Sequence, residues 1–161
     1  MNLLLTVGTS RFPFRRFFEY VTNLLPNIVC SGDTIYIQYG FNSPITLNLE
    51  GVNIESFKFV SVEAFSDIVS SCNQVITHGA AGTIMQCCQA GIRPLVLCRD
   101  ANFGEHSDNH QVFSSKVFAD MDLCRLSKLD LLEDINFLTG CNFVQPMRLS
   151  GKSVSNYLDF L

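Results

Sequence analysis

The sequence predicts one α/β domain, built on a parallel β-sheet with helices on both faces. Short apolar runs alternate with segments of helical periodicity along the 161 residues, as expected for βαβ units. The length is typical of a single domain, and no repeat, low-complexity tract or linker divides the chain. We therefore expect one domain over residues 1–161, with ligands bound at the carboxyl ends of the strands.

The first half of the chain contains three predicted strands and two predicted helices. Residues 2–7 (NLLLTV) form a continuous apolar run typical of a buried strand, and residues 34–39 (TIYIQY) are rich in β-forming side chains. Residues 57–60 are the third strand candidate. A helix is predicted over residues 13–25, because one proline fits its first turn and another follows its end. The second helix is predicted over residues 62–71.

The second half continues this alternation of strands and helices. Residues 74–77 (QVIT) and 93–98 (RPLVLC) are strand candidates, and the proline of the latter lies near its start. Between them, residues 82–90 form a predicted helix that ends before a glycine suited to a left-handed cap. Helices are also expected over residues 108–119 and 128–138. The tract from about residue 139 has no strong periodicity, and we interpret it as a segment that docks on a partner.

Composition and charge narrow the class of protein. Charged residues make up 16% of the chain, below the roughly 25% of typical soluble domains, which fits either a surface covered by a partner or a polar uncharged surface. The net charge of −4 predicts no nucleic-acid binding. Arg11, Arg15 and Arg16 form a basic cluster among phenylalanines. The cluster is either the solvent-exposed face of an amphipathic helix or a docking surface for a partner or for membrane headgroups.

The cysteines and apolar segments predict a reduced, cytosolic protein. The seven cysteines include no CxxC motif, so a zinc ribbon is not indicated. The opening apolar run lacks a basic leader and a small-residue cleavage site. No run approaches the roughly 18 apolar residues that are needed to span a bilayer.

Two loops that follow predicted strands combine glycine with hydroxyl side chains. The first is residues 8–10 (GTS), and the second is residues 78–83 (HGAAGT). Glycine lets the backbone come close to a ligand, and the N–H groups of a following helix favour an anion. Both loops are therefore candidates for holding a diphosphate, although small residues also close ordinary strand–helix turns. Neither loop matches GxGxxG or GxxxxGK[ST], which argues against NAD and ATP hydrolysis.

A third loop, residues 99–111 (RDANFGEHSDNHQ), is rich in planar hydrogen-bonding side chains. Amides and carboxylates at the carboxyl end of a strand are suited to sugar hydroxyls. Asp108 is also a candidate helix N-cap. His106 and His110 have the i, i+4 spacing that suits a metal, but no HExxH pattern accompanies them, and we expect no metal.

Together these segments resemble the C-terminal domain of glycosyltransferase family 28. The resemblance covers about residues 2–126, and it rests on residues 7–10 (VGTS), 12–14 (FPF), 78–83, 91–96 (GIRPLV), Arg99 and 103–111. It is strongest with the short, single-domain branch of the family. That branch includes bacterial polysaccharide glycosyltransferases of the PssE and EpsF type and the catalytic subunit of the eukaryotic dolichol-linked N-acetylglucosaminyltransferase.

The resemblance implies a half-enzyme with a Rossmann-like fold, equivalent to the C-terminal, donor-binding half of a GT-B glycosyltransferase. It implies inverting transfer of a hexose or N-acetylhexosamine from a UDP-sugar to a lipid-diphosphate-linked saccharide, with no cofactor and no metal. The acceptor-binding half would be a separate, membrane-anchored subunit that recruits this chain to the cytosolic face of a membrane. A non-catalytic subunit that binds nucleotide sugar or acts as a scaffold is the alternative.

The resemblance also assigns residues to the donor site. The residues near the diphosphate are Gly8, Thr9, Ser10, His78, Gly79, Ala80, Gly82 and Thr83. Asn109 and Gln111 correspond to the segment that contacts the donor sugar or diphosphate, and the backbone near Ser61 and Val62 to the stretch that meets uracil. Gln86 replaces the glutamate that usually holds the ribose, so a charge-assisted hydrogen bond is lost. On chemistry alone, the general-base candidates are Glu105, His106 and His110, unless the partner supplies the base.

Overall fold

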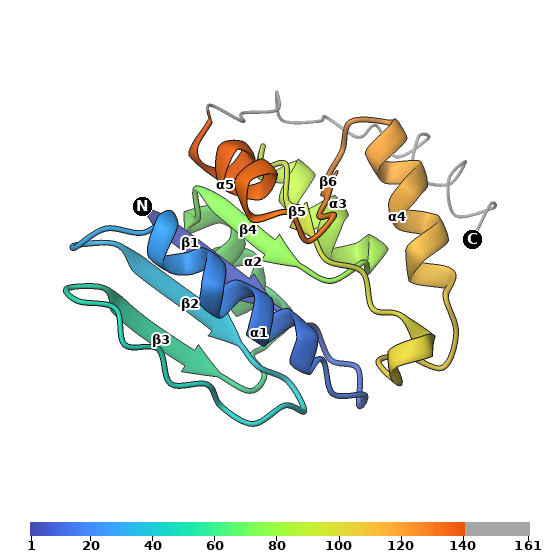
Figure 1. Cartoon of the computed structure of the whole chain (residues 1–161), viewed down its shortest axis with the longest axis horizontal. Helices are drawn as coiled ribbons and strands as arrows, with labels where there is room; N and C mark the ends of the chain where they lie inside the picture. Colours follow the sequence, from blue (N-terminus) through green and yellow to red (C-terminus); the bar gives the residue numbers. More distant parts are fainter. Residues whose placement is uncertain (141–161) are drawn as a thin grey trace.

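The computed structural model describes residues 1–140 and contains a six-stranded parallel sheet with the strand order β3-β2-β1-β4-β5-β6 (Figure 1). The strands are β1 (Asn2–Thr6), β2 (Thr34–Gln38), β3 (Asn53–Phe57), β4 (Gln74–Thr77), β5 (Leu95–Val96) and β6 (Arg125–Leu126). The α-helices are α1 (Arg15–Leu24), α2 (Val62–Ser71), α3 (Ala81–Gln89), α4 (His110–Asp120) and α5 (Leu131–Thr139), and two 3₁₀-helices are η1 (Leu25–Asn27) and η2 (Ala101–Phe103). The parallel α/β architecture predicted from the sequence is confirmed. The predicted docking segment from about residue 139 lies almost wholly outside the described residues.

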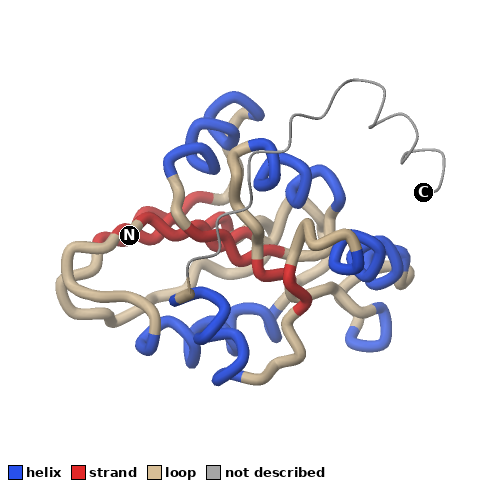
Figure 2. The backbone as a smooth tube through the Cα atoms, turned by 90° about the horizontal axis from the view of Figure 1, so that it is seen from above, coloured by secondary structure: helices blue, strands red, loops and turns tan. Residues whose placement is uncertain are grey.

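Helices cover both faces of the sheet (Figure 2). Alternate residues of β1 point to opposite faces, as the period of a strand requires. Leu3 and Leu5 pack in one cluster with α1 and α5, whereas Leu4 packs in another with α2 and α3. A third cluster joins α3 to α4 through side chains such as Cys88 and Phe118. The central strands are thus buried on both sides, which explains their continuous apolar runs.

The outer strands differ from the sequence-based expectation. The third strand was predicted at residues 57–60, but β3 occupies Asn53–Phe57 and pairs with β2. Its side chains are mostly exposed, so it lacks the apolar run that marks a buried strand. The predicted strand at residues 93–98 shrinks to the two residues of β5, and the two-residue strand β6 was not predicted.

Three helices also begin later than predicted, because their N-terminal residues serve as caps or loops. Helix α1 begins at Arg15 instead of Pro13. Helix α4 begins at His110, so Asp108 is not its N-cap, which is Asn109 without a side-chain capping bond. Helix α5 begins at Leu131, because the Asp130 side chain accepts a hydrogen bond from the Glu133 amide and caps the helix there.

Within residues 1–140, no helix is long and apolar enough to cross a bilayer. The six cysteines of this part of the chain are all free. Because all strands are parallel, the loops after them meet at one edge of the sheet, and that edge carries the candidate site.

Candidate functional site

A cavity of about 300 Å³ opens at the carboxyl ends of the central strands. Its walls come from the loops after β1, β3 and β4, from the last residue of β2, and from helices α2 and α3. The lining residues are Gly8, Thr9, Gln38, Val60, Ser61, Val62, Phe65, His78, Ala80, Gly82, Thr83 and Gln86. Segments far apart in the sequence therefore share one cavity, as the two glycine loops had been expected to do.

The cavity gathers most, but not all, of the residues singled out in the sequence. Ser10, Gly79, Asn109 and Gln111 do not line it, and neither do the general-base candidates Glu105, His106 and His110. Gly79 faces helix α4, where an added Cβ would lie 2.6 Å from the Ser115 Oγ. The Asn109 side chain accepts a hydrogen bond from the Ala101 amide (2.8 Å), which holds the turn at η2. Gly79 and Asn109 thus support the loops around the cavity.

The first glycine loop is shaped by a tight contact with His78. Gly8 has a φ of +69°, and an added Cβ would lie 2.4 Å from two ring atoms of His78. The Gly8 amide donates to the Thr6 hydroxyl oxygen (3.2 Å). Helix α1 begins only at Arg15, so this loop does not present a helix N-terminus to the cavity. The expectation that the N–H groups of a following helix face the ligand at both loops is therefore wrong for the first loop.

The second glycine loop does lead directly into a helix. Helix α3 begins at Ala81, its N-cap residue Ala80 makes no side-chain capping bond, and its first turn has no acidic residue. The amides of this first turn are orphan donors at the positive end of the helix dipole. Since Gly82 and Thr83 line the cavity, the N-terminus of α3 can bind an anion there.

His78 contributes a neutral imidazole to this site. The side chain is buried, and burial, together with the nearby Arg99 guanidinium, lowers its pKa to about 3. The Thr77 hydroxyl lies 3.2 Å from its Nδ1. His78 therefore forms part of the cavity wall as an uncharged polar ring at neutral pH.

Exchanging His78 for glutamine is expected to flatten the acid dependence of stability. The folded protein keeps His78 neutral down to a pH of about 3, whereas the unfolded chain binds a proton below about pH 6.5. Stability therefore falls as pH decreases through this window, by up to about 1.4 kcal/mol per pH unit. Urea unfolding of both proteins from pH 7 to 4.5 measures the difference. Equal slopes for the two proteins would refute the assignment.

Arg99 ties the first and third loops together. Its guanidinium is fully buried and donates to the carbonyls of Val7 (2.8 Å), Phe12 (2.8 Å) and Glu105 (3.0 Å). Burial lowers its pKa to about 10, so it remains charged at neutral pH. In the sequence, Arg99 could be recognised only as part of the family motif. Its hydrogen bonds to Phe12 and Val7 join residues that are 87 and 92 positions apart in the sequence.

The three general-base candidates have different environments. The buried Glu105 carboxylate makes a two-pronged ion pair with Arg16 (3.0 and 2.7 Å) and accepts a hydrogen bond from the Asp100 amide. His106 packs against Phe12. The exposed His110 contacts the Asp108 carboxylate through Nδ1, and its hydrogen bonds to Asp108 lower the pKa of that carboxyl group.

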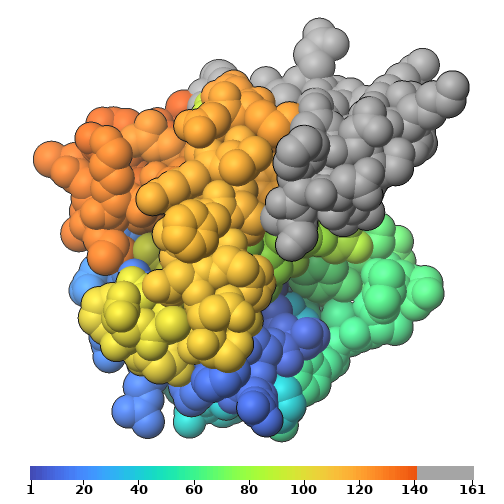
Figure 3. Space-filling model, turned by 90° about the vertical axis from the view of Figure 1, so that its right-hand side faces the viewer, coloured from blue at the N-terminus to red at the C-terminus, as the bar shows by residue number. Residues whose placement is uncertain are grey.

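His106, Asp108 and His110 could also hold a cation, since their ligand atoms lie within 4.8 Å of one another. In this arrangement, however, the Asp108 carboxylate is already engaged by His110. These residues belong to the loop and helix start that form a continuous surface beside the first loop, as Figure 3 shows in yellow and orange.

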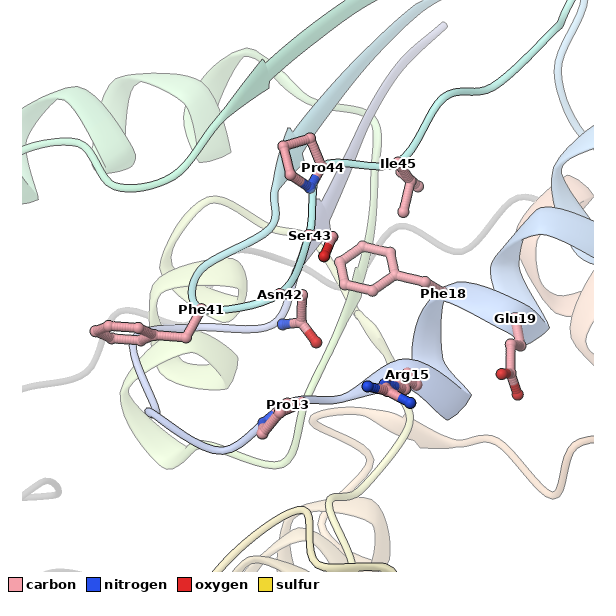
Figure 4. Close-up of a pocket in the computed structure, with 9 residues that line it drawn as sticks. All are labelled: Pro13, Arg15, Phe18, Glu19, Phe41, Asn42, Ser43, Pro44 and Ile45. Carbon is pink, nitrogen blue, oxygen red and sulfur yellow. The ribbon is translucent and has the colours of Figure 1, made fainter.

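A second cavity of about 420 Å³ lies beside α1 (Figure 4). Its walls are Pro13, Arg15, Phe18, Glu19, Phe41, Asn42, Ser43, Pro44 and Ile45. None of the residues assigned to the donor site lines it. The smaller cavity at the glycine loops therefore remains the candidate site.

Solved structures with a similar fold are glycosyltransferases. MurG of Acinetobacter baumannii has 17% identity and a TM-score of 0.60 over 85% of this chain and 39% of its own. The glycosyltransferase of kitacinnamycin has 15% identity and a TM-score of 0.63 over 86% of this chain and 35% of its own. CalG4, the calicheamicin glycosyltransferase, has 14% identity and a TM-score of 0.59 over 83% of this chain and 33% of its own. The chain thus spans well under half the length of these proteins.

Comparison with curated protein sequences finds no match. The sequence model of the glycosyltransferase family 28 C-terminal domain, in contrast, matches residues 2–133. This match includes β1 to β6 and every residue that lines the 300 Å³ cavity. The chain therefore belongs to the glycosyltransferase family 28 C-terminal domain family, with the Rossmann-like fold of the C-terminal half of a GT-B glycosyltransferase.

Proposed function

We propose that this chain is the UDP-sugar-binding, catalytic subunit of a two-component inverting glycosyltransferase. It would transfer a hexose or N-acetylhexosamine to a lipid-diphosphate-linked saccharide at the cytosolic face of a membrane. The observation that carries the proposal is the uncapped start of α3, which opens into the same cavity as the first glycine loop. A diphosphate fits this arrangement because it is an anion that several backbone amides can bind at once.

Gly82 supports a ligand at this position. An added Cβ at Gly82 would meet nothing within 4 Å, and the residue does not have a positive φ. The fold itself therefore gives no steric or conformational reason for glycine at the start of α3. A ligand that comes close to the backbone would explain the glycine, because any side chain there would block its approach.

Gly82→Ala is expected to weaken UDP binding about tenfold, equivalent to about 1.4 kcal/mol, without loss of stability. The added methyl group would stand between the helix start and the diphosphate. The free energy of unfolding should stay the same or rise by up to about 1 kcal/mol, because alanine is the better helix former. Calorimetric titration with UDP and urea unfolding test the two parts. Wild-type UDP affinity in the folded variant would contradict the placement of the diphosphate at the N-terminus of α3.

In the proposed reaction, UDP leaves as the acceptor hydroxyl attacks the sugar. The growing charge on UDP would be stabilised by the first-turn amides of α3 and by the Thr83 hydroxyl. The acceptor hydroxyl must lose its proton to a base. His110 suits this role better than Glu105, because Asp108 holds its Nδ1 and leaves the exposed Nε2 to accept a proton, whereas Arg16 engages Glu105. The partner remains an alternative source of the base.

An apolar patch beside the cavity supports a partner protein that covers it. Phe41 and Phe59 are 50% and 40% exposed, their rings contact each other, and the Lys58 ammonium lies over both. Val60 and Val62 are also exposed, and they line the cavity as well. A membrane-anchored, acceptor-binding subunit would bury this patch. Transfer to a lipid acceptor should then require the second protein, and full activity of the purified chain alone would rule out the two-component scheme.

A non-catalytic, nucleotide-sugar-binding or scaffolding subunit is the second candidate. Gln86 favours it, because this cavity-lining residue is neutral and makes weaker hydrogen bonds than a carboxylate. UDP binding without turnover of any UDP-sugar, in the presence of the partner subunit, would favour this candidate over the catalytic one.

A further inference from the structure

We propose that Gln38 recognises the nucleoside part of the donor through its side-chain amide. This proposal rests on the proposed function and adds a residue to it. Gln38 is the last residue of β2, is only 5% exposed, and lines the 300 Å³ cavity. A buried carboxamide needs hydrogen-bond partners.

The Thr6 hydroxyl fixes the orientation of this carboxamide. Its oxygen accepts a hydrogen bond from the Gly8 amide (3.2 Å), and the hydroxyl donates to the Gln38 Oε1 (2.6 Å). The carbonyl side of the carboxamide is therefore satisfied within the protein. The Nε2 group, which carries two N–H donors, has no hydrogen-bond partner among residues 1–140.

The position of Gln38 in the sheet indicates which part of a nucleotide it meets. Strand β2 lies between β1 and β3, whereas α3 follows β4 on the far side of β1. The cavity extends from the start of α3 to the end of β2 and the loop after β3, so a nucleotide with its diphosphate at α3 would place its nucleoside there. There, Val60, Val62 and Phe65 provide an apolar wall that suits a planar base.

The Gln38 Nε2 thus offers a hydrogen-bond donor in the same cavity as the apolar wall of Val60, Val62 and Phe65. It suits an oxygen acceptor, such as a uracil carbonyl or a ribose oxygen. A phosphate oxygen is the competing acceptor for this donor, and ligands that lack phosphate distinguish the two.

The test compares wild type with Gln38→Met and Gln38→Glu in titrations with UDP and with uridine, the latter by ligand-observed NMR. Methionine keeps the length of the side chain and removes its donors. Glutamate keeps the acceptor for Thr6 and replaces the donors with oxygen. Both variants should bind UDP and uridine about tenfold more weakly, the change expected for one lost hydrogen bond. Gln89→Met, at the exposed end of α3, is the matched control and should bind normally.

The outcomes separate this inference from the proposed function. Wild-type affinity of both folded variants for UDP would overturn the role of Gln38 and leave the donor site intact. A loss for UDP but not for uridine would place Gln38 at the diphosphate and overturn its assignment to the nucleoside. Failure of wild type to bind UDP would overturn the proposed function together with this inference. Melting temperatures distinguish a loss of binding from a loss of fold, and Gln38→Glu serves if Gln38→Met does not fold.

Discussion

Replacing Arg99 with methionine is expected to destabilise the fold by about 3–5 kcal/mol and to abolish measurable UDP binding. The buried guanidinium donates to three backbone carbonyls, of which two flank the first loop and one lies in the third. Methionine fills much of the volume but leaves these carbonyls without a donor. The first loop would then lose the connection that holds Val7 and Phe12 beside Glu105.

Urea unfolding and calorimetric titration with UDP measure these two effects. Arg15→Met is the matched control, because Arg15 is exposed and makes no ion pair within residues 1–140. Its free energy of unfolding should change by less than about 0.5 kcal/mol. If Arg99→Met were no less stable than Arg15→Met, Arg99 would not be the connection between the loops.

Gly8→Ala is expected to cost about 2–4 kcal/mol of stability and to weaken UDP binding. Two costs add here: the left-handed backbone at φ +69°, and the collision of the new methyl group with the His78 ring at 2.4 Å. Either the first loop or His78 must move, and both line the cavity.

Gly32→Ala isolates the backbone part of this cost. Gly32 also has a positive φ, of +90°, but an added Cβ there would meet nothing within 4 Å. Gly32→Ala should lower the free energy of unfolding by only about 1–2 kcal/mol, the penalty of the left-handed conformation. UDP binding should be unaffected. Equal destabilisation by the two substitutions would show that the contact between Gly8 and His78 is unimportant.

The sequence predicts elements with a local signal, such as a capping residue or a buried apolar run, better than elements without one. The predicted helix at residues 62–71 and the predicted strand at residues 74–77 match α2 and β4 residue for residue. Ser61 marks the start of α2 because its hydroxyl caps the Ala64 amide, and β4 is an apolar run in a central strand. Strand β3 was misplaced and β6 was missed because neither has a buried apolar run. Both are strands because they pair with a neighbouring strand.

The same distinction holds for the site. Glycine, histidine and hydroxyl residues in the two loops could be recognised from composition and from the family resemblance, and most of them line the cavity. Gln38 was missed because it ends a strand whose other residues read as ordinary core. The signal was present, since a glutamine at the carboxyl end of a central strand faces the ligand edge of a parallel sheet. The supporting contacts of Gly79 and Asn109 involve α4 and η2, and no local pattern predicts them.

A crystal structure of the chain with UDP tests the central claim most directly. The account predicts the β-phosphate within hydrogen-bonding distance of the first-turn amides of α3, near Gly82 and Thr83, with the nucleoside between Gln38 and Phe65. A diphosphate bound elsewhere, such as in the 420 Å³ cavity beside α1, with the start of α3 left empty, would contradict it.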